Sequence, residues 1–401
     1  VKECMMFQTE SASEKEFSGW NELYVWVAEE EKFTSRVPIH GLLKNGAKFQ
    51  EDKYFGSSEY KLAFTEEGLK ALCYKLGFPM LALEMTKESE LASKILNDLL
   101  SQDNAKAQLS NSEFVINEKD NDKSHGKVCG IVSSSYVGYS NNSFIQDIEN
   151  IIGKNDLSPS GQLALKEAYS INTRLHLRLT STHISGTVSG RGGISEDKTE
   201  IGLEFCNSMV GDAAVSIDYF LHRLVCANGL VLPAGQNGAR VIHSGKAKNF
   251  LSRLDKAFGD VFSGLGEKAT YVNQLSDIEF YPQRLAELDL SKMIFDIIPK
   301  SKSTVIDMYR NAFNDFIFRK LSPEDKLKRE ELAIGYLPLC FAGELSKAVF
   351  NSKYRDNASM FDLINVFTEH AKEKSPSEKV EIQRRSGQLA DWVVKNKKKF
   401  K

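Results

Sequence analysis

The sequence predicts an α+β protein, with a central, mostly antiparallel sheet covered by helices and a helical C-terminal section. Two patterns carry this prediction. Leucines alternate with polar side chains over residues 174–180, which is the period of two of a strand. Residues 247–262 instead place apolar side chains at helical spacing, and the last third of the chain continues in the same way.

The chain of 401 residues is long enough for two or three units. We expect three sections: a strand-and-helix section over residues 1–110, a strand-rich core over residues 111–265 that ends in a helix, and a helical section over residues 266–401.

In the first section, residues 23–27 read as a strand because they are apolar and β-branched or aromatic. Residues 65–76 predict an amphipathic helix, with Thr65 as its N-cap. A second helix is expected over residues 89–100. Residues 101–112 are polar and are predicted to be a linker.

The core begins with a predicted hairpin of strands 113–117 and 127–132, followed by a short helix over residues 142–152. Three longer strands are expected at residues 174–185, 199–207 and 214–226. Asn228-Gly229 predicts a tight hairpin turn after the last of them, because both turn positions need a positive φ. The helices expected after this turn are residues 247–262, 281–298, 304–320, 360–374 and 376–395.

The composition excludes several classes. A formal net charge of −2 excludes a uniformly basic protein, so any contact with nucleic acid must come from a local patch. The sequence contains no run of about 18 apolar residues, the length needed to span a bilayer, and its start lacks the apolar core of a secretory signal. The six cysteines form no Cys-x-x-Cys pair, so no metal site is expected. Most of them sit beside apolar residues, so we expect buried, reduced thiols and hence a cytoplasmic location. No cofactor is expected.

Basic residues gather between residues 174 and 254, and from Tyr219 to Leu254 there is no Asp or Glu. A basic face on a sheet suits a polyanion, and Tyr136, Tyr139 and Tyr219 could stack on bases. The candidate nucleic-acid-binding residues are Arg174, His176, Arg178, Arg191, Arg223, Arg240, Lys246, Lys248 and Arg253. A competing reading pairs Arg174 and Arg178 with Glu200 and Glu204 on a neighbouring strand.

A second group of special residue types consists of Asn207, Ser208, Gly211, Cys226, Asn228 and Gly229. Each has a structural reading, since Asn and Ser bond to nearby backbone and Gly supplies positive φ. Arg223 shares its strand face with apolar residues and therefore needs a carboxylate, carbonyl groups or a bound anion. Glu204 and Asp218 are candidate partners for it.

Signatures of enzymes are poor. The glycine-rich segment 185–193 lacks the Gly-Lys-Ser/Thr ending of a nucleotide loop and precedes a strand. Zinc-protease, serine-hydrolase and zinc-deaminase motifs are absent from the sequence. No catalytic residue is therefore assigned.

Five segments resemble, in order, a family described as domain of unknown function 932, of phage- and plasmid-like proteins. They are Phe64–Pro79, Gly130–Tyr136, Glu204–Gly211, His222–Leu230 and Met360–His370. The resemblance implies a mobile-element context and a strand-rich centre wrapped by helices. The family has no settled activity, so the resemblance implies no reaction.

Three functions stay open. The first is a mobile-element protein that binds nucleic acid, such as a single-strand binding or annealing factor, with self-association expected. The alternative is a protein-interaction factor that counters a host defence complex, which the near-zero net charge and helical last third would suit. The second alternative is an enzyme acting on nucleic acid through an unrecognised site around Asn207, Arg223 and Asn228.

Overall fold

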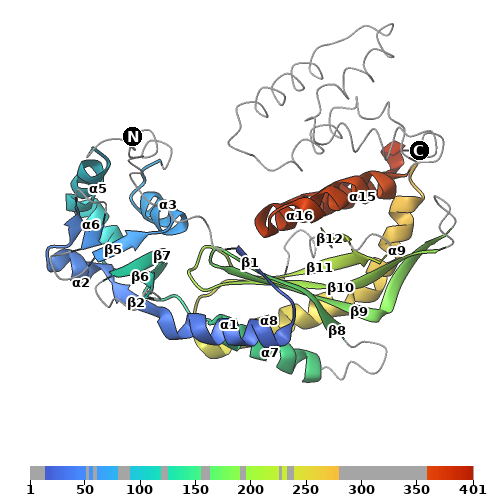
Figure 1. Cartoon of the computed structure of the whole chain (residues 1–401), viewed down its shortest axis with the longest axis horizontal. Coiled ribbons are helices and arrows are strands. Elements are labelled where there is room, and N and C mark those ends of the chain that lie inside the picture. Colours follow the sequence, from blue (N-terminus) through green and yellow to red (C-terminus); the bar gives the residue numbers. More distant parts are fainter. Residues whose placement is uncertain are drawn as a thin grey trace, which may run out of the picture.

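The computed structural model describes residues 14–50, 54–56, 61–79, 91–118, 125–154, 163–189, 196–224, 228–232, 239–279 and 359–400. Over these residues the predicted α+β class is confirmed: two sheets are packed against helices, and the last described section is helical. Figure 1 shows the smaller sheet beside one end of the larger one. The predicted helices 281–298 and 304–320 lie outside the described residues.

The larger sheet is antiparallel throughout its described strands. Its order is β1 (Glu14–Phe17), β8 (Leu163–Ile171), β9 (Arg174–Ser189), β10 (Glu196–Ser208), β11 (Val215–Arg223) and β12 (Asn228–Leu232), and β13 (Ala239–Val241) also pairs with β11. The predicted strands 174–185, 199–207 and 214–226 are therefore confirmed as β9 to β11. Strand β8 was not predicted.

The smaller sheet combines strands from both sides of residue 110. Its order is β2 (Thr34–Pro38), β6 (Ser112–Asn117), β7 (His125–Ser133), β5 (Lys61–Phe64), β4 (Phe55–Gly56) and β3 (Lys48–Phe49), with β5 and β7 parallel. The predicted hairpin of residues 113–117 and 127–132 is confirmed as β6 and β7. Helices around this sheet are α2 (Ile39–Lys44), α3 (Glu66–Lys75), α5 (Leu91–Ser101) and α6 (Asp103–Leu109).

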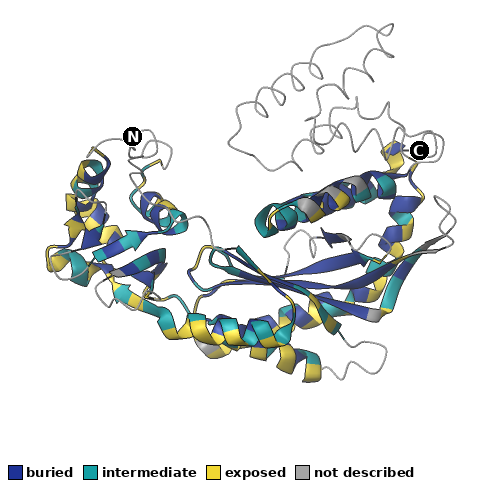
Figure 2. Cartoon of the chain, in the orientation of Figure 1, coloured by how far each residue is buried: buried dark blue, intermediate teal, exposed yellow. Residues whose placement is uncertain are grey.

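Helices cover both faces of the larger sheet (Figure 1). On one face lie α15 (Met360–His370) and α16 (Pro376–Lys395). Across the other run α7 (Asn141–Lys154), α8 (Ala247–Ser263) and α9 (Leu265–Ser276), with α1 (Trp20–Phe33) beside α7. The larger sheet is accordingly coloured as buried over most of its length in Figure 2.

Strand β9 is buried on both faces, and not on one as its alternation predicts. Leu175, Leu177 and Leu179 pack in the apolar core with α7, α8 and α9. The alternate side chains His176 and Arg178 are 3% and 0% exposed, because α16 covers them. The period of two is therefore correct, but the outward polar face is wrong.

Two predictions for the N-terminal part of the chain, residues 1–112, are wrong. Residues 23–27 belong to helix α1, in which Leu23 and Val27 lie one turn apart and form the buried stripe. The predicted linker 101–112 contains helix α6, whose Ala105 and Leu109 are buried at the same spacing. Short apolar runs fit a strand and a helix equally well, and here the packing decides.

The helix ends are better predicted. The Thr65 hydroxyl caps α3 by accepting a hydrogen bond of 3.1 Å from the Gly68 N–H. Helix α8 covers the predicted range 247–262 almost residue for residue, and the last two helices match α15 and α16.

The hairpin of β11 and β12 forms, but its turn precedes Asn228-Gly229. These two residues already pair with Arg223 and His222. Among the described residues, Gly211 has the expected positive φ of 79° and Gly229 does not. A Cβ at Gly229 would instead overlap the ring of Phe220. Gly229 is therefore required by close packing and not by the turn.

None of the described helices combines the length and the apolar character that crossing a bilayer needs.

Gly387 sets how closely α16 approaches the sheet, because a Cβ there would overlap the backbone carbonyl of Val231 in β12. We expect Gly387→Ala to lower the free energy of unfolding by about 1–3 kcal/mol, measured by urea denaturation. The matched control is Gly259→Ala at an exposed position of α8, where a Cβ meets nothing within 4 Å. That change should stabilise the protein by up to about 1 kcal/mol. Equal effects of the two substitutions would contradict the close approach.

Candidate functional site

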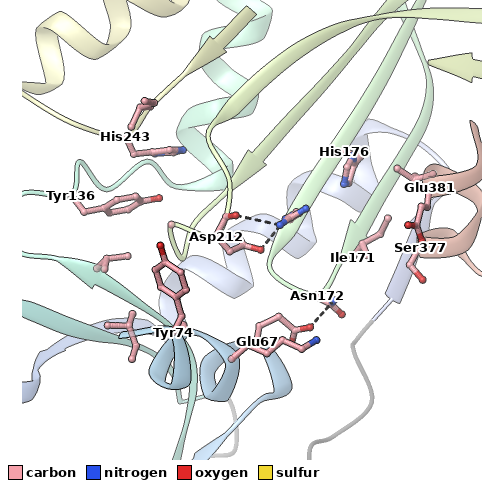
Figure 3. Close-up of a pocket in the computed structure, with 18 of the residues that line it drawn as sticks. Glu67, Tyr74, Tyr136, Ile171, Asn172, His176, Asp212, His243, Ser377 and Glu381 are labelled. Atoms are coloured by element: carbon pink, nitrogen blue, oxygen red, sulfur yellow. Dashed lines mark hydrogen bonds and ion pairs between the residues drawn. The ribbon is translucent and has the colours of Figure 1, made fainter. Parts of the chain in front are cut away.

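A cleft of about 1060 Å³ opens between α3 of the smaller sheet and the β8–β9 end of the larger sheet, with α16 as a further wall. Figure 3 shows residues from these elements around it: Glu67 and Tyr74 from α3, Asn172 between β8 and β9, and Ser377 and Glu381 from α16. Residues far apart in the chain therefore build one site.

One hydrogen bond joins the two sides of the cleft. Asn172, with a left-handed φ of 56°, occupies the turn between β8 and β9. Its side-chain Nδ2 donates to Glu67 Oε1 of α3 at 3.0 Å. This contact connects the smaller sheet's helix with the larger sheet and helps to fix the width of the cleft.

Positive charge exceeds negative charge in the lining, with five Lys and Arg side chains against three Asp and Glu. The basic residues are Lys70, Lys75, Arg174, Arg384 and Arg385. Most of them are ion-paired: Arg174 Nε lies 2.8 Å from Asp212 Oδ2, and Lys70 Nζ lies 2.7 Å from Glu66 Oε1. Within the described parts of the chain, Lys75 makes no ion pair. The cleft is thus weakly basic, and Lys75 is the cation of its lining that has no carboxylate partner among the described residues.

Tyr74 is the most exposed large hydrophobic side chain among the described residues, at 86%. It lies on the polar side of α3, since Leu72 and Cys73 beside it belong to the buried stripe. Figure 3 shows the ring pointing into the cleft. An aromatic ring left in water beside cations offers a flat face for stacking.

A stacked pair of rings forms another part of the lining. Tyr136 and His243 lie with ring centroids 5.0 Å apart and an interplanar angle of 18°, as Figure 3 shows. The Tyr136 hydroxyl donates to the Ser208 carbonyl at 2.9 Å, which holds the pair in place. Burial lowers the pKa of His243 to about 4, so its ring is neutral near pH 7.

Beneath α16, the even-numbered side chains of β9 and β10 form a buried ionic network. Arg178 Nε donates to Glu204 Oε2 at 2.6 Å, and both side chains are 0% exposed. Arg178 Nη1 also reaches Glu167 of β8 at 2.7 Å and Gln383 of α16 at 2.6 Å. Arg384 Nη2 of α16 contacts Glu204 Oε1 at 2.5 Å. The network therefore joins the sheet to the helix.

This network fixes the ionisation of Glu204. Burial alone would raise the pKa of the carboxyl, but Arg178 and Arg384 hold it well below its usual range. The predicted cross-strand pairing of Glu204 with Arg178 is confirmed. Glu200 instead accepts from Thr180 at 3.0 Å and lies 3.5 Å from Lys166.

The prediction that His176 and Arg178 belong to an exposed basic face is therefore wrong, because both lie under α16. Arg174 remains partly exposed but is paired with Asp212. Arg223 lies over the ring of Phe361 in α15, with its guanidinium carbon 5.5 Å from the ring centroid. Glu204, one of the two carboxylates predicted to pair with Arg223, instead forms ion pairs with Arg178 and Arg384.

The remaining predicted cations lie on or before α8 and are exposed: Arg240, Lys246, Lys248 and Arg253. Arg253 donates to the carbonyls of Ile242 and Ser244 at 3.1 and 2.6 Å. Both of these residues line the cleft, so Arg253 fixes the chain at its edge. Arg191 lies outside the described residues.

Asn207 and Ser208 are structural. Asn207 is fully buried, and its Nδ2 donates to the Tyr139 carbonyl and to Asn141 Oδ1 at 3.2 and 2.9 Å. It thereby joins the end of β10 to the start of α7 and the residues just before it, and does not bond to the backbone of its own strand end as predicted. Ser208 donates to Asp212, beside Gly211 in the same turn. Cys226 and the Asn228 side chain lie outside the described set.

Of the tyrosines predicted to stack on bases, Tyr139 and Tyr219 are 6% and 7% exposed and belong to the core. The prediction is therefore wrong for these two residues. The residues that sequence reasoning missed are Lys70, Tyr74 and Lys75 of α3 and Arg384 and Arg385 of α16. The signal for Tyr74 was present, since it is an aromatic residue on the polar side of an amphipathic helix. Nothing local marked the arginines of α16.

A family model described as domain of unknown function (DUF932) matches residues 128–392, from within β7 into α16. This agrees with the resemblance seen in four of the five segments, while Phe64–Pro79, which contains α3, precedes the matched range. No curated protein and no solved structure matches the chain.

The buried pair of Arg178 and Glu204 should dominate local stability. We expect Arg178→Met to lower the free energy of unfolding by about 3–5 kcal/mol, because Glu204 would stay charged and buried after losing one of its two arginine partners. Arg174→Met removes a partly exposed pair and should cost less than about 1 kcal/mol. Urea denaturation of both variants measures the difference. Similar losses in the two would mean that the network contributes no more than a surface pair.

Proposed function

This chain belongs to the family described as domain of unknown function (DUF932), and on that premise we propose that it binds single-stranded nucleic acid in the cleft between α3 and α16. We place this role in the cytoplasm, in a phage or plasmid setting, as a single-strand binding or annealing factor. The observation that carries the proposal is the exposed Tyr74 beside Lys75 in a cleft whose lining has more cations than anions.

Single-stranded binding needs two things, a positive groove for the backbone and aromatic faces for the bases. Tyr74 supplies an exposed face, whereas the rings of Tyr136 and His243 in the same lining are covered by each other, by Arg36 and by Phe250. An unpaired base can offer its face to such a ring without the cost of unstacking a duplex. The geometry therefore favours a single strand over a duplex.

The path for a phosphate backbone can continue past the cleft along the start of α8. Ser244 lines the cleft, and Lys246 is the N-cap of α8 two residues later. The first turn of this helix contains no acidic residue, and both Lys246 and Lys248 are exposed. The positive end of the helix dipole adds to their attraction for phosphate.

Affinity should be modest and dependent on salt. Arg174, Arg384 and Arg385 in the lining already have carboxylate partners, so a phosphate must compete with these acids. Each phosphate contact also releases a counterion on binding. Titration of a fluorescent oligonucleotide, followed by anisotropy at low and at moderate salt, tests the proposal. Absence of binding at low salt would overturn it.

Tyr74→Ala should weaken binding of the single-stranded oligonucleotide by about 5- to 100-fold, because one base loses its stacking face. Tyr74→Phe keeps the ring and should retain affinity. Anisotropy titration of the three proteins measures the effect. Since the ring is exposed, neither change should alter the fold. An equal loss in both variants would exclude stacking.

Lys75→Ala should reduce the dependence of log affinity on log salt by about 0.7, the value for one phosphate contact on a single strand. Lys44→Ala is the matched control, because Lys44 is an exposed lysine at the end of α2 that does not line the cleft. Titrations at several salt concentrations give the slopes. An unchanged slope for Lys75→Ala would remove this residue from the interface.

A further inference from the structure

A thiol, an imidazole and a carboxylate lie next to one another in a row on the sheet face beneath α16. Cys206 and His176 are cross-strand neighbours in β10 and β9. The Cys206 Sγ lies 3.7 Å from His176 Nε2, and His176 Nδ1 lies 3.7 Å from Glu204 Oε1. The two imidazole nitrogens thus face the other two groups, one each.

The carboxylate at the end of this row is fixed in place. Glu204 is held from two sides, by Arg178 and by Arg384. The imidazole is less constrained, because His176 Nδ1 has no hydrogen-bond partner within the described residues. A small rotation of the ring could bring it into hydrogen-bond distance of Glu204, as is common when a site closes on its substrate.

A cationic side chain lies near the thiol. Arg384 lies close enough to Cys206 for the two to interact electrostatically. Burial lowers the pKa of His176, but Cys206 and Glu204 raise it more, to about 9, so the share of neutral imidazole that can accept a proton grows as the pH rises toward 9. Burial raises the pKa values of the other two described cysteines, Cys73 and Cys129, to about 11 and about 12, which disfavours their nucleophilic thiolate form.

The group adjoins the cleft. His176 and Arg384 both line it, although Cys206 itself is 3% exposed. The Nε atom of Arg384 is buried and makes no hydrogen bond in the described part of the chain. A spare N–H donor near a nucleophile can stabilise the negative oxygen that forms on an attacked carbonyl group.

From this geometry we propose that Cys206 is a nucleophile that accepts an acyl group from an activated ester or thioester entering through the cleft. His176 acts as its base, Glu204 is the positioning residue, and Arg384 Nε donates to the developing oxyanion. The inference is independent of nucleic-acid binding, because it concerns the thiol and not the exposed surface of α3.

The chemistry uses two steps and needs only water besides the ester. In the first, the Cys206 sulfur bonds to the carbonyl carbon, its proton passes to His176, and the carbon–oxygen or carbon–sulfur bond to the leaving group breaks. His176 then gives its proton to the leaving group. In the second, water attacks the thioester, again with His176 as base, and releases a carboxylic acid and the free thiol.

p-Nitrophenyl acetate is a suitable probe. The intact chain should release nitrophenolate, and peptide mass spectrometry of the quenched protein should find acetyl on Cys206 at least about tenfold faster than on Cys73 or Cys129. Equal or slower acetylation of Cys206 in the folded wild-type protein would overturn the proposal. This measurement needs no variant and no nucleic acid.

Substitutions then assign the roles. Cys206→Ser should abolish the fast release, and His176→Gln should slow it by about 100-fold, the contribution of a general base. Cys73→Ala removes a cysteine outside the cleft and should leave the rate unchanged. Circular dichroism verifies the fold of each variant. A folded His176→Gln protein that reacts at the wild-type rate would show that the imidazole does not activate the thiol.

Discussion

The buried contact between Arg178 and Glu204 is the constraint on which the rest of the structure depends. Two charges at 0% exposure are tolerated because Glu167, Gln383 and Arg384 give them further hydrogen-bond and ionic partners, with Arg178 Nη2 left without a hydrogen bond among the described residues. Two of these three partners come from α16. The sheet can therefore bury its polar face only when this helix is in place, and the helix has one position that satisfies both charges.

The position of α16 in turn shapes the cleft. Ser377, Glu381 and Arg384 contribute to its lining from one side, and α3 contributes from the other. Because Arg178 is used in the network and Arg174 is paired with Asp212, strand β9 offers little free positive charge. Cations that make no ion pair among the described residues include Lys75 of α3 and Lys246 and Lys248 at the start of α8. A polyanion would therefore meet helices and not the face of the sheet.

The same region brings two kinds of chemistry together. An exposed ring and cations lie on the surface of the cleft, while a thiol, an imidazole and a carboxylate lie behind one wall. The second group depends on the register of β9 and β10, in which Arg178 faces Glu204 and His176 faces Cys206. A shift of β9 by one residue would turn His176 and Arg178 to the opposite face, away from Glu204 and Cys206.

The sequence by itself determined the periodicity, and with it the strands β9 to β11, the cap of α3 and the last two helices. It also offered pairing of Arg174 and Arg178 with Glu200 and Glu204 as the alternative to a basic face, and of these pairs the structure forms the one between Arg178 and Glu204. It could not determine what covers each face, since period two describes a strand with one or two buried faces equally well. Only the tertiary structure placed α16 over the polar face, brought Gln383 and Arg384 to residues about 200 positions earlier, and placed Tyr74 in the lining of a cleft. Such contacts depend on packing between distant segments, which no local pattern encodes.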